Sequence, residues 1–336
     1  MPPLRVGVVG VGSLGQHHAR VYADLAPARL IGVHDIDAAR AAEIAGRHGC
    51  RAFASLDALL AETDAVSVAV PTADHHRVAS RVLEQGRHAL VEKPLTATLA
   101  EADELIALAR RRQLVLQAGH IERFNPALEL LRRHVLEPRF VEVHRLGSFS
   151  PRSLDIDVVL DLMIHDLDIV LSLDGSEAVQ VDAVGVPVLT PRVDIANARI
   201  RFASGLIANL TASRVSAEKI RKFRVFAPRT YVSLDFASRS GQVYRLTERD
   251  GQPDIQVEKV AAPEEEPLRR QLDAFVRAAA GEAPAQVTGE AGRAALALAH
   301  RVLEGMEGQA TMARGSEATT TRQVVVDSLS SRGRAE

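Results

Sequence analysis

Residues 5–15 read Arg-Val-Gly-Val-Val-Gly-Val-Gly-Ser-Leu-Gly, and Asp35 lies twenty residues beyond the last of these glycines. A short β-branched run leads into Gly10-x-Gly12-x-x-Gly15, and a stretch of helical character follows it. This order of strand, glycine turn and helix is typical of a dinucleotide-binding βαβ unit. Gly10 allows a tight turn, Gly12 lets the backbone approach a pyrophosphate, and Gly15 lets the helix pack on the sheet. The phosphates are then expected on unpaired amides at the helix N-terminus.

Further cofactor contacts follow from the same unit. Ser13 and Leu14 complete the glycine turn. Asp35 ends the second predicted strand, where its carboxylate can accept hydrogen bonds from both ribose hydroxyls of an adenosine. Because a 2′-phosphate would be repelled there, the sequence predicts NAD rather than NADP as the cofactor. Arg40, one helical turn away, is a cation that could soften this preference.

The turns after the strands predicted over 65–70 and 88–91 are expected at the same edge of the sheet. Ligands of open parallel sheets bind outside the carboxyl ends of the strands. The residues predicted to line the cofactor site there are Pro71, Thr72, His75, Glu92 and Lys93. Two alternatives stay open: His75 can cap or pack at the start of its helix, and Lys93 can be a surface lysine beside a proline turn.

The composition is that of a globular protein with about two domains, since the chain has 336 residues, of which 46% are hydrophobic and 25% charged. A net charge of -2 gives no reason to expect nucleic acid or an acidic membrane as a partner. The single cysteine, Cys50, excludes an intrachain disulfide framework and fits a reducing compartment. Without a membrane-spanning run or a signal-peptide pattern, a cytoplasmic location is expected. The histidines lack zinc-motif spacing, so no metal is expected.

The first part of the chain alternates strand and helix signals, which predicts a parallel sheet covered by helices. Strands are predicted over 4–9, 29–34, 51–54, 65–70, 88–91 and 114–117. Helices are predicted over 13–25, 37–47, 56–61, 75–85 and 99–112. Residues 1–122 are therefore expected to form an NAD-binding Rossmann domain.

The pattern changes at Phe140, after which polar and apolar residues alternate in longer strands. Strands are predicted over 141–144, 196–202, 206–213, 223–226, 231–236 and 243–247, and helices over 267–280 and 289–305. Alternation of this kind favours a mostly antiparallel sheet with one covered face. The predicted fold is thus α/β: a Rossmann domain, then an α/β domain with an open sheet over 123–312, and a polar tail over 313–336.

One motif of the second half carries chemistry. In Asp161-Leu-Met-Ile-His165, a helix would place the carboxylate and the imidazole on one face. Such a pair is a candidate for acid–base work, because histidine titrates near neutrality and suits removal of an alcohol proton. An amphipathic helix with a salt-bridged histidine is the alternative.

Gly10-x-Gly12-x-x-Gly15, Glu92-Lys93-Pro94 and Asp161-x-x-x-His165, in this order and at these distances, resemble the glucose–fructose oxidoreductase/inositol dehydrogenase/MocA (Gfo/Idh/MocA) family over about residues 4–310. The resemblance implies an NAD-dependent dehydrogenase with Lys93, Asp161 and His165 as its catalytic residues. It also implies that the open sheet forms the interface of a homodimer or homotetramer.

Residues 119–126, Gly-His-Ile-Glu-Arg-Phe-Asn-Pro, and residues 161–168, preceded by Arg152 and Asp155, are similar to family members that act on nucleotide sugars. This similarity implies oxidation of a secondary sugar hydroxyl, the 3-hydroxyl of UDP-N-acetylglucosamine, to a 3-keto sugar. The basic stretch 212–222 is either a diphosphate contact or a solvated strand edge. The substrate contacts expected are Arg123, Asn125, Arg152, Asp161, His165 and Arg214.

Two other functions remain possible at this point. One is an inositol or simple-sugar dehydrogenase of the same family, which has no use for a phosphate-binding cluster. The other is a non-catalytic sensor that binds NAD and a partner protein, although a sensor needs no proton acceptor beside the nicotinamide.

Overall fold

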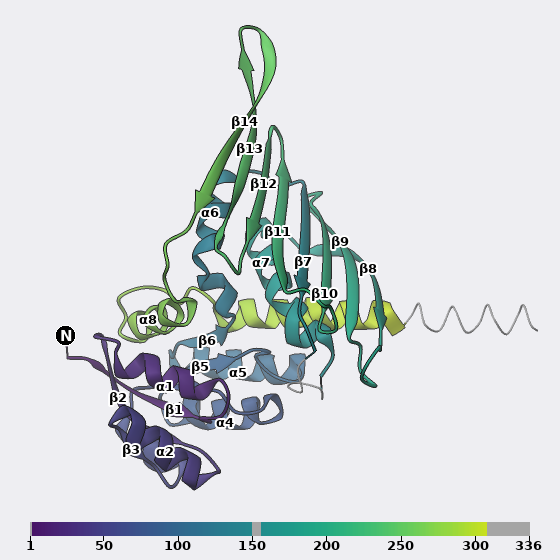
Figure 1. Ribbon diagram of the computed structural model, residues 1–336. Coiled ribbons are helices and arrows are strands. Elements are labelled where there is room, and N and C mark those ends of the chain that lie inside the picture. Colours follow the sequence, from purple (N-terminus) through teal and green to yellow (C-terminus); the bar gives the residue numbers. More distant parts are fainter. Residues whose placement is uncertain (1, 150–155, 308–336) are drawn as a thin grey trace, which may run out of the picture.

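The first sheet is parallel and carries helices on both faces, in a computed structural model that describes residues 2–149 and 156–307 (Figure 1). Its strand order is β3-β2-β1-β4-β5-β6. The strands are β1 Leu4–Val9, β2 Ala28–His34, β3 Arg51–Ala52, β4 Ala65–Val68, β5 His88–Glu92 and β6 Leu116–Gly119. The helices are α1 Gly15–Ala23, α2 Ala38–His48, α3 Leu56–Glu62, α4 Thr72–Glu84 and α5 Leu99–Arg112. The predicted Rossmann fold is confirmed.

Local signals in the sequence account for the ends of these helices. The side chains of Asp37 and Ser55 cap α2 and α3 by accepting hydrogen bonds from backbone N–H groups. Thr98 and Glu101 form the capping box predicted for α5. Gly49 ends α2 in the left-handed conformation that glycine adopts most easily.

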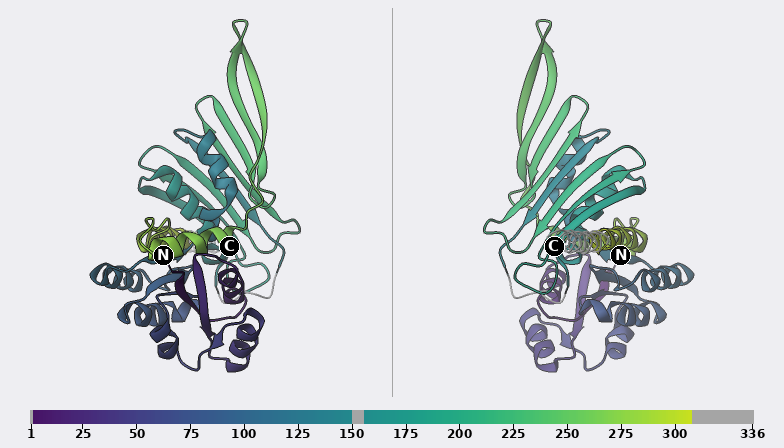
Figure 2. Two further views of the ribbon diagram at one scale, coloured as in Figure 1. Left: turned by 90° about the vertical axis from the view of Figure 1, so that its left-hand side faces the viewer. Right: turned by 90° about the vertical axis from the view of Figure 1, so that its right-hand side faces the viewer.

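The second sheet is mostly antiparallel, with the strand order β14-β13-β12-β11-β7-β10-β9-β8 and one parallel pair, β7 with β10 (Figure 2). Its strands are β7 Phe140–Leu146, β8 Ala178–Val186, β9 Ile195–Phe202, β10 Ile207–Ser213, β11 Ile220–Ala227, β12 Thr230–Asp235, β13 Ser240–Arg249 and β14 Gln252–Ala261. The other elements are the 3₁₀ turn η1 Ile121–Phe124, α6 Pro126–His134, the π turn η2 Val159–Met163, α7 Ile164–Asp174 and α8 Pro267–Ala279. The predicted open sheet is therefore confirmed.

Two strands, β8 and β14, and the helix α6 were not among the predicted elements, and of α7 only the start was considered. Strand β14 is exposed at almost every residue, so it lacks the apolar alternation by which a strand is recognised. It pairs only with β13, and this hairpin projects beyond the rest of the sheet (Figure 1). The strand β8 and the helices α6 and α7 complete the layer.

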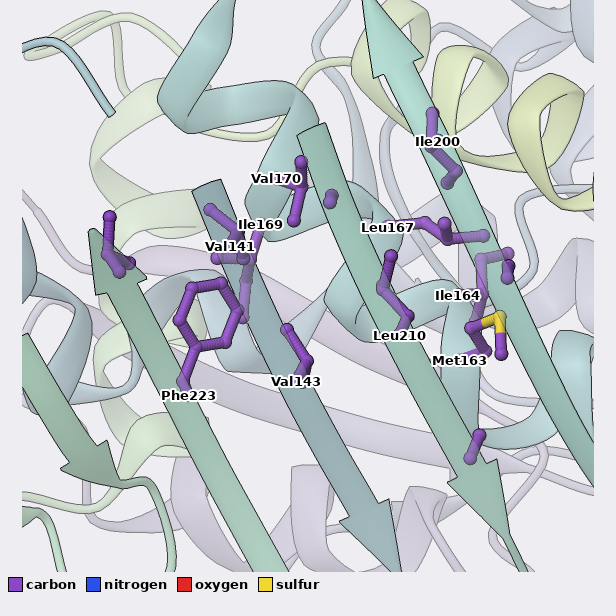
Figure 3. Close-up of a cluster of buried hydrophobic side chains, with 14 of the residues drawn as sticks. Val141, Val143, Met163, Ile164, Leu167, Ile169, Val170, Ile200, Leu210 and Phe223 are labelled. Atoms are coloured by element: carbon purple, nitrogen blue, oxygen red, sulfur yellow. The ribbon is translucent and has the colours of Figure 1, made fainter. Parts of the chain in front are cut away.

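Helix α7 covers the middle of the second sheet. Its Ile164, Leu167 and Val170 are fully buried and lie over apolar side chains of the central strands (Figure 3). The strand residues labelled there are Val141, Val143, Ile200, Leu210 and Phe223. Because this contact fixes α7 on the sheet, it also fixes His165 in the first turn of α7 and Asp161 directly before it.

The end of the described chain returns to the first domain. Helix α8 packs its Leu272 and Phe275 into the core beside β1 and α1. The helix over residues 289–307 then crosses between the two sheets (Figure 1). A side chain at Gly289 or Gly292 would collide with β6, whereas Val302 belongs to the core of the second domain. Among the described residues, no helix has the length and apolar run that crossing a membrane requires.

Candidate active site

The glycine turn between β1 and α1 has no room for side chains at two positions. Gly10 has φ 79°, and a Cβ on Gly15 would lie 1.7 Å from the carbonyl oxygen of Gly10. At Gly12 the nearest atom to such a Cβ is an Arg40 guanidinium nitrogen at 3.6 Å, so the backbone there is open. Ser13 and Leu14 are exposed beside it. The turn therefore has the close helix packing and the open amides that a pyrophosphate site needs.

Asp35 lies where a ribose contact requires it. Its carboxylate oxygens accept hydrogen bonds from the backbone N–H groups of Val11 at 2.7 Å and Asp37 at 2.9 Å. These bonds hold the carboxylate beside the glycine turn, and the Arg40 guanidinium lies close to Gly12 of the same turn. The turns after β4 and β5 lie at the same edge of the sheet, and Pro71 and Thr72 start α4 there.

Lys93 joins the two domains at the carboxyl end of β5. Its Nζ donates to the backbone carbonyl oxygen of Asp161 at 2.6 Å and to Oδ1 of the same residue at 3.2 Å. Asp161 lies in the π turn η2, directly before α7, rather than in the regular helix that its spacing to His165 predicts. Wide turns of this type are common at functional sites, because their altered hydrogen bonding changes which backbone and side-chain groups point outward.

His165 is the residue beside this lysine with the properties of a base. Burial, followed by the charges of Lys93 and Arg145, holds the pKa of His165 well below its ordinary value. The imidazole is therefore neutral at pH 7 and can accept a proton. Its Nδ1 is buried, so Nε2 is the nitrogen left to a substrate.

The ring of His120, a residue not predicted as part of the site, lies edge-on to His165 with 6.3 Å between the ring centroids. His120 is fully buried. Burial lowers the pKa of His120, while the charge of Asp168 opposes the shift. His120 belongs to the stretch 119–126 that resembles nucleotide-sugar enzymes, but no role could be assigned to it from the sequence, because its contact with His165 comes from another part of the chain.

His75 and Glu92 are buried next to the turns after β4 and β5, where they contact other protein groups. The ring nitrogens of His75 lie 2.8 Å from the Pro94 carbonyl oxygen and 2.9 Å from that of Val70, so the side chain ties the two cofactor-edge turns together. Glu92 is buried against His18 of α1, with 3.2 Å between Oε1 and Nε2. Although burial opposes its charge, the hydrogen bond and charge of His18 lower the pKa of Glu92. Both residues are thus buried and contact protein groups, and their contact with the cofactor stays a prediction.

A buried ion-pair network fixes η1 and α7 against β7. Arg145 donates two hydrogen bonds to Asp166, both of 2.7 Å, and one to Glu122 of 2.9 Å. Burial disfavours the charge of Arg145, but the two carboxylates outweigh it and hold the arginine pKa above its ordinary value. Since Asp166 adjoins His165 and Glu122 is close to His120 in the chain, this network positions both histidines.

Replacing Arg145 by methionine should lower the free energy of unfolding by about 3–5 kcal/mol, because two buried carboxylates lose their cation. Urea denaturation followed by circular dichroism measures this loss. The matched control is Arg224→Met, which removes a half-exposed pair with Glu142 between the neighbouring strands and should cost no more than about 1 kcal/mol. Equal effects of the two changes would contradict the positioning role of Arg145.

The other predicted substrate residues are distributed around the site. Asn125 caps α6, and its amide also donates to Glu122 and to the Phe236 carbonyl. Arg214 is buried against Asp194 at 2.8 Å and also donates to backbone and hydroxyl oxygens. Arg123 pairs with Asp168 at 3.2 Å, and the charges of both residues act on His120. Arg152 lies outside the described residues. Substrate contact by these four residues stays a prediction.

The chain matches two family models. The model described as the oxidoreductase family's NAD-binding Rossmann fold (Gfo/Idh/MocA) matches residues 4–120, and that of the family's C-terminal domain matches residues 134–232. UDP-N-acetylglucosamine 3-dehydrogenase of Acidithiobacillus ferrooxidans is 45% identical over 307 residues, which cover 90% of this chain and 97% of that protein. A solved structure of that enzyme covers 92% of this chain and 99% of its own, with a TM-score of 0.86 at 45% identity. Inositol 2-dehydrogenase of Rhizobium meliloti is 28% identical over 63% of this chain and 69% of its own length.

Proposed function

Because the chain belongs to the Gfo/Idh/MocA family of NAD-binding oxidoreductases, we propose that it oxidises the 3-hydroxyl of UDP-N-acetylglucosamine to a 3-keto nucleotide sugar. The observation that carries the proposal is the contact between Lys93 of the first domain and Asp161 of the second, directly beside His165. The choice of sugar rests on the 45% identity to the Acidithiobacillus ferrooxidans enzyme over almost the whole of both chains.

The residues at the edge of the first sheet fit NAD. The crowded Gly10 and Gly15 and the open Gly12 suit a pyrophosphate, and the Asp35 carboxylate suits an adenosine ribose. Ser13, Leu14, Arg40, Pro71 and Thr72 are the further contacts proposed around it. When bound, NAD supplies the acceptor for the hydride that leaves the sugar carbon.

In the proposed mechanism the protein handles the proton and the developing charge. Nε2 of His165 accepts the hydroxyl proton, since the ring is neutral at pH 7. Lys93 uses two of its three N–H donors on Asp161, which leaves one for the substrate oxygen. That donor stabilises the negative charge on the oxygen as the carbonyl forms. Asp161 fixes the lysine and lies within reach of the same sugar.

The diphosphate contact is proposed at Arg221 of β11, which belongs to the predicted basic stretch. Arg221 is half-exposed, pairs with Glu122 at 3.4 Å and acts electrostatically on His165. It lines a cavity of about 320 Å³ together with Arg239. Two guanidinium groups near one cavity suit the oxygens of a diphosphate.

The test is absorbance of reduced nicotinamide with NAD and a panel of UDP-sugars, inositols and free hexoses. The proposal expects a signal with UDP-N-acetylglucosamine, and UDP alone should compete with it. Reaction with an inositol or a free hexose, but with no nucleotide sugar, would exclude the proposed substrate. A cytoplasmic location is proposed on the composition alone.

A second test concerns the preference for NAD over NADP, which is proposed to depend on Asp35. Asp35→Ser should lower kcat/KM for NAD by about ten- to a hundredfold, because ribose hydrogen bonds to a carboxylate are lost. The loss for NADP should be much smaller, since the repulsion of its 2′-phosphate is removed and Arg40 is close by. Asp37→Ser is the control, because a serine can still cap α2 and should leave the NAD/NADP ratio unchanged. The ratio of the two kcat/KM values measures the effect.

A homodimer or homotetramer formed through the second sheet is also proposed. Apolar side chains that are exposed on its outer strands support this proposal, namely Val184, Val186, Leu246, Ile255 and Val257. Light scattering after size-exclusion chromatography gives the mass in solution, and a monomer at micromolar concentration would exclude it.

A further inference from the structure

Four buried polar atoms lie behind the site without a protein partner. They are Nδ1 of His165, both ring nitrogens of His120 and Oδ2 of Asp168, and none of them makes a hydrogen bond to any residue that the structure describes. His120 is fully buried and Asp168 is 1% exposed. Buried polar atoms in proteins normally have a partner, either a protein group or an ordered water. These four atoms therefore have hydrogen-bonding capacity that the protein leaves to ordered water or to a transferred proton.

These side chains are arranged in sequence from the base outward. The rings of His165 and His120 are perpendicular, with centroids 6.3 Å apart, so one water or a small ring rotation can connect their nitrogens. Asp168 exerts the strongest charge effect on His120, and Lys93, Arg123 and Glu92 are the other charged groups that face it. Oδ1 of Asp168 accepts a hydrogen bond from Arg123 at 3.2 Å, while its Oδ2 remains available.

Arg123 connects this row to a large cavity on the far side. The cavity has a volume of about 800 Å³ and lies between η1, α6, α8 and the loop after α1. Several of its lining residues are exposed, among them Arg132, Glu264 and Arg269, so it is open to water. Asp168, the last member of the row, is therefore one ion pair away from a cavity that is open to solvent.

We propose that His120 and Asp168 carry the proton from His165 to this cavity during turnover. The proposal rests on the dehydrogenase function proposed above. In each oxidation the carbinol C–H bond breaks and its hydride reduces NAD, the O–H bond breaks and its proton binds Nε2 of His165, and the C=O bond forms. His165 releases a proton from Nδ1 to His120, whose imidazolium is stabilised by the Asp168 carboxylate. The other ring nitrogen of His120 gives its proton, by way of Oδ2 of Asp168, to water in the cavity, so one proton leaves for each NADH formed. His165 then carries its proton on Nε2 and not on Nδ1, so both rings return to their starting tautomers by proton exchange with water after the product has left.

The relay gives the proton on His165 a route to solvent that the bound substrate does not block. The Nε2 face of His165 is covered by substrate while the proton must leave, and Nδ1 is closed off from solvent by the protein. Arg145, Lys93 and Arg221 also face His165 and favour loss of its proton. His120 is the nearest ring that can accept it, and removing it should separate proton release from hydride transfer.

The experiment follows both events in one stopped-flow run, in weak buffer with a pH indicator. The full-length protein is mixed with NAD and the member of the sugar panel that reduces it. In the native protein, proton release and NADH formation should coincide. In His120→Phe the first turnover should form NADH within about threefold of the native rate, because His165 is intact, whereas proton release and steady-state kcat should fall about tenfold or more. Asp168→Asn, which keeps an acceptor for Arg123, should show the same separation.

His120→Ala and a control variant complete the design. Added imidazole should restore proton release in His120→Ala, which a purely structural role of His120 would not allow. His76→Phe, the same replacement at a residue paired with Glu104 on the surface of α4, should behave like the native protein. Coincident proton and NADH traces in His120→Phe and Asp168→Asn would overturn the relay. Failure of UDP-N-acetylglucosamine alone within the panel would overturn the proposed substrate and leave the relay to be tested with the sugar that reacts.

Discussion

His165→Ala is expected to lower kcat by about two to four powers of ten, because the hydroxyl loses its proton acceptor. NAD binding should survive, since no contact of His165 reaches the glycine turn or Asp35. Lys93→Met should cause a similar loss, because the charge on the substrate oxygen is then unsupported. Steady-state kinetics with the reacting sugar measures kcat, and fluorescence titration with NADH measures cofactor affinity.

Matched replacements away from the site serve as controls for this pair. His76→Ala on α4 and Lys259→Met on β14 should keep the native kcat. The native enzyme should also remain active below pH 6.5. Since the pKa of His165 is lowered, the ring stays neutral until the pH falls through that lower value, and kcat/KM is lost only there. Native turnover in both His165→Ala and Lys93→Met would exclude them as catalytic residues.

Gly15→Ala is expected to abolish NAD binding, raising Kd by about a hundredfold or more, which is at least about 2.7 kcal/mol. The new Cβ would lie 1.7 Å from the carbonyl oxygen of Gly10, so helix α1 must move away from the turn that holds the pyrophosphate. The control is Gly46→Ala within α2, where nothing lies within 4 Å of the added carbon. That change should stabilise the protein by about 0.5–1 kcal/mol, since alanine is the better helix former. NAD titration and thermal unfolding separate the two effects, and normal NAD affinity of Gly15→Ala would contradict the packing argument.

Local sequence was enough to predict the first sheet and its helix caps. Strand β1 has the predicted bounds, Leu4–Val9, and Asp37, Ser55 and Thr98 cap the predicted helices. These features depend on residues close together in the chain, where hydrogen-bonding and hydrophobic patterns are short-ranged. Strand β14 was missed because its pairing with β13, and not burial, makes it a strand.

The site was predictable only in part. Its motifs consist of residues close together in the chain, whereas the residues that hold the motifs in place come from distant parts of the chain. Lys93 and His165 were identified from motif and resemblance. His18, His120 and Arg145 were not, because each acquires its role from a contact made across tertiary structure: with Glu92, with His165, and with Asp166 and Glu122. For His75, the contacts with the Val70 and Pro94 carbonyls favour the packed interpretation, and contact with the cofactor stays a prediction.

The helix over residues 289–307 connects the two domains. It packs against β6 at Gly289 and Gly292 and in the core of the second domain at Val302. The same helix therefore contacts both domains. Rotation of one domain relative to the other would break the contacts at Gly289 and Gly292 or those at Val302. This helix therefore helps to hold Lys93 of the first domain beside Asp161 and His165 of the second. The contact between Lys93 and Asp161 across the domain boundary is thus already formed in the structure.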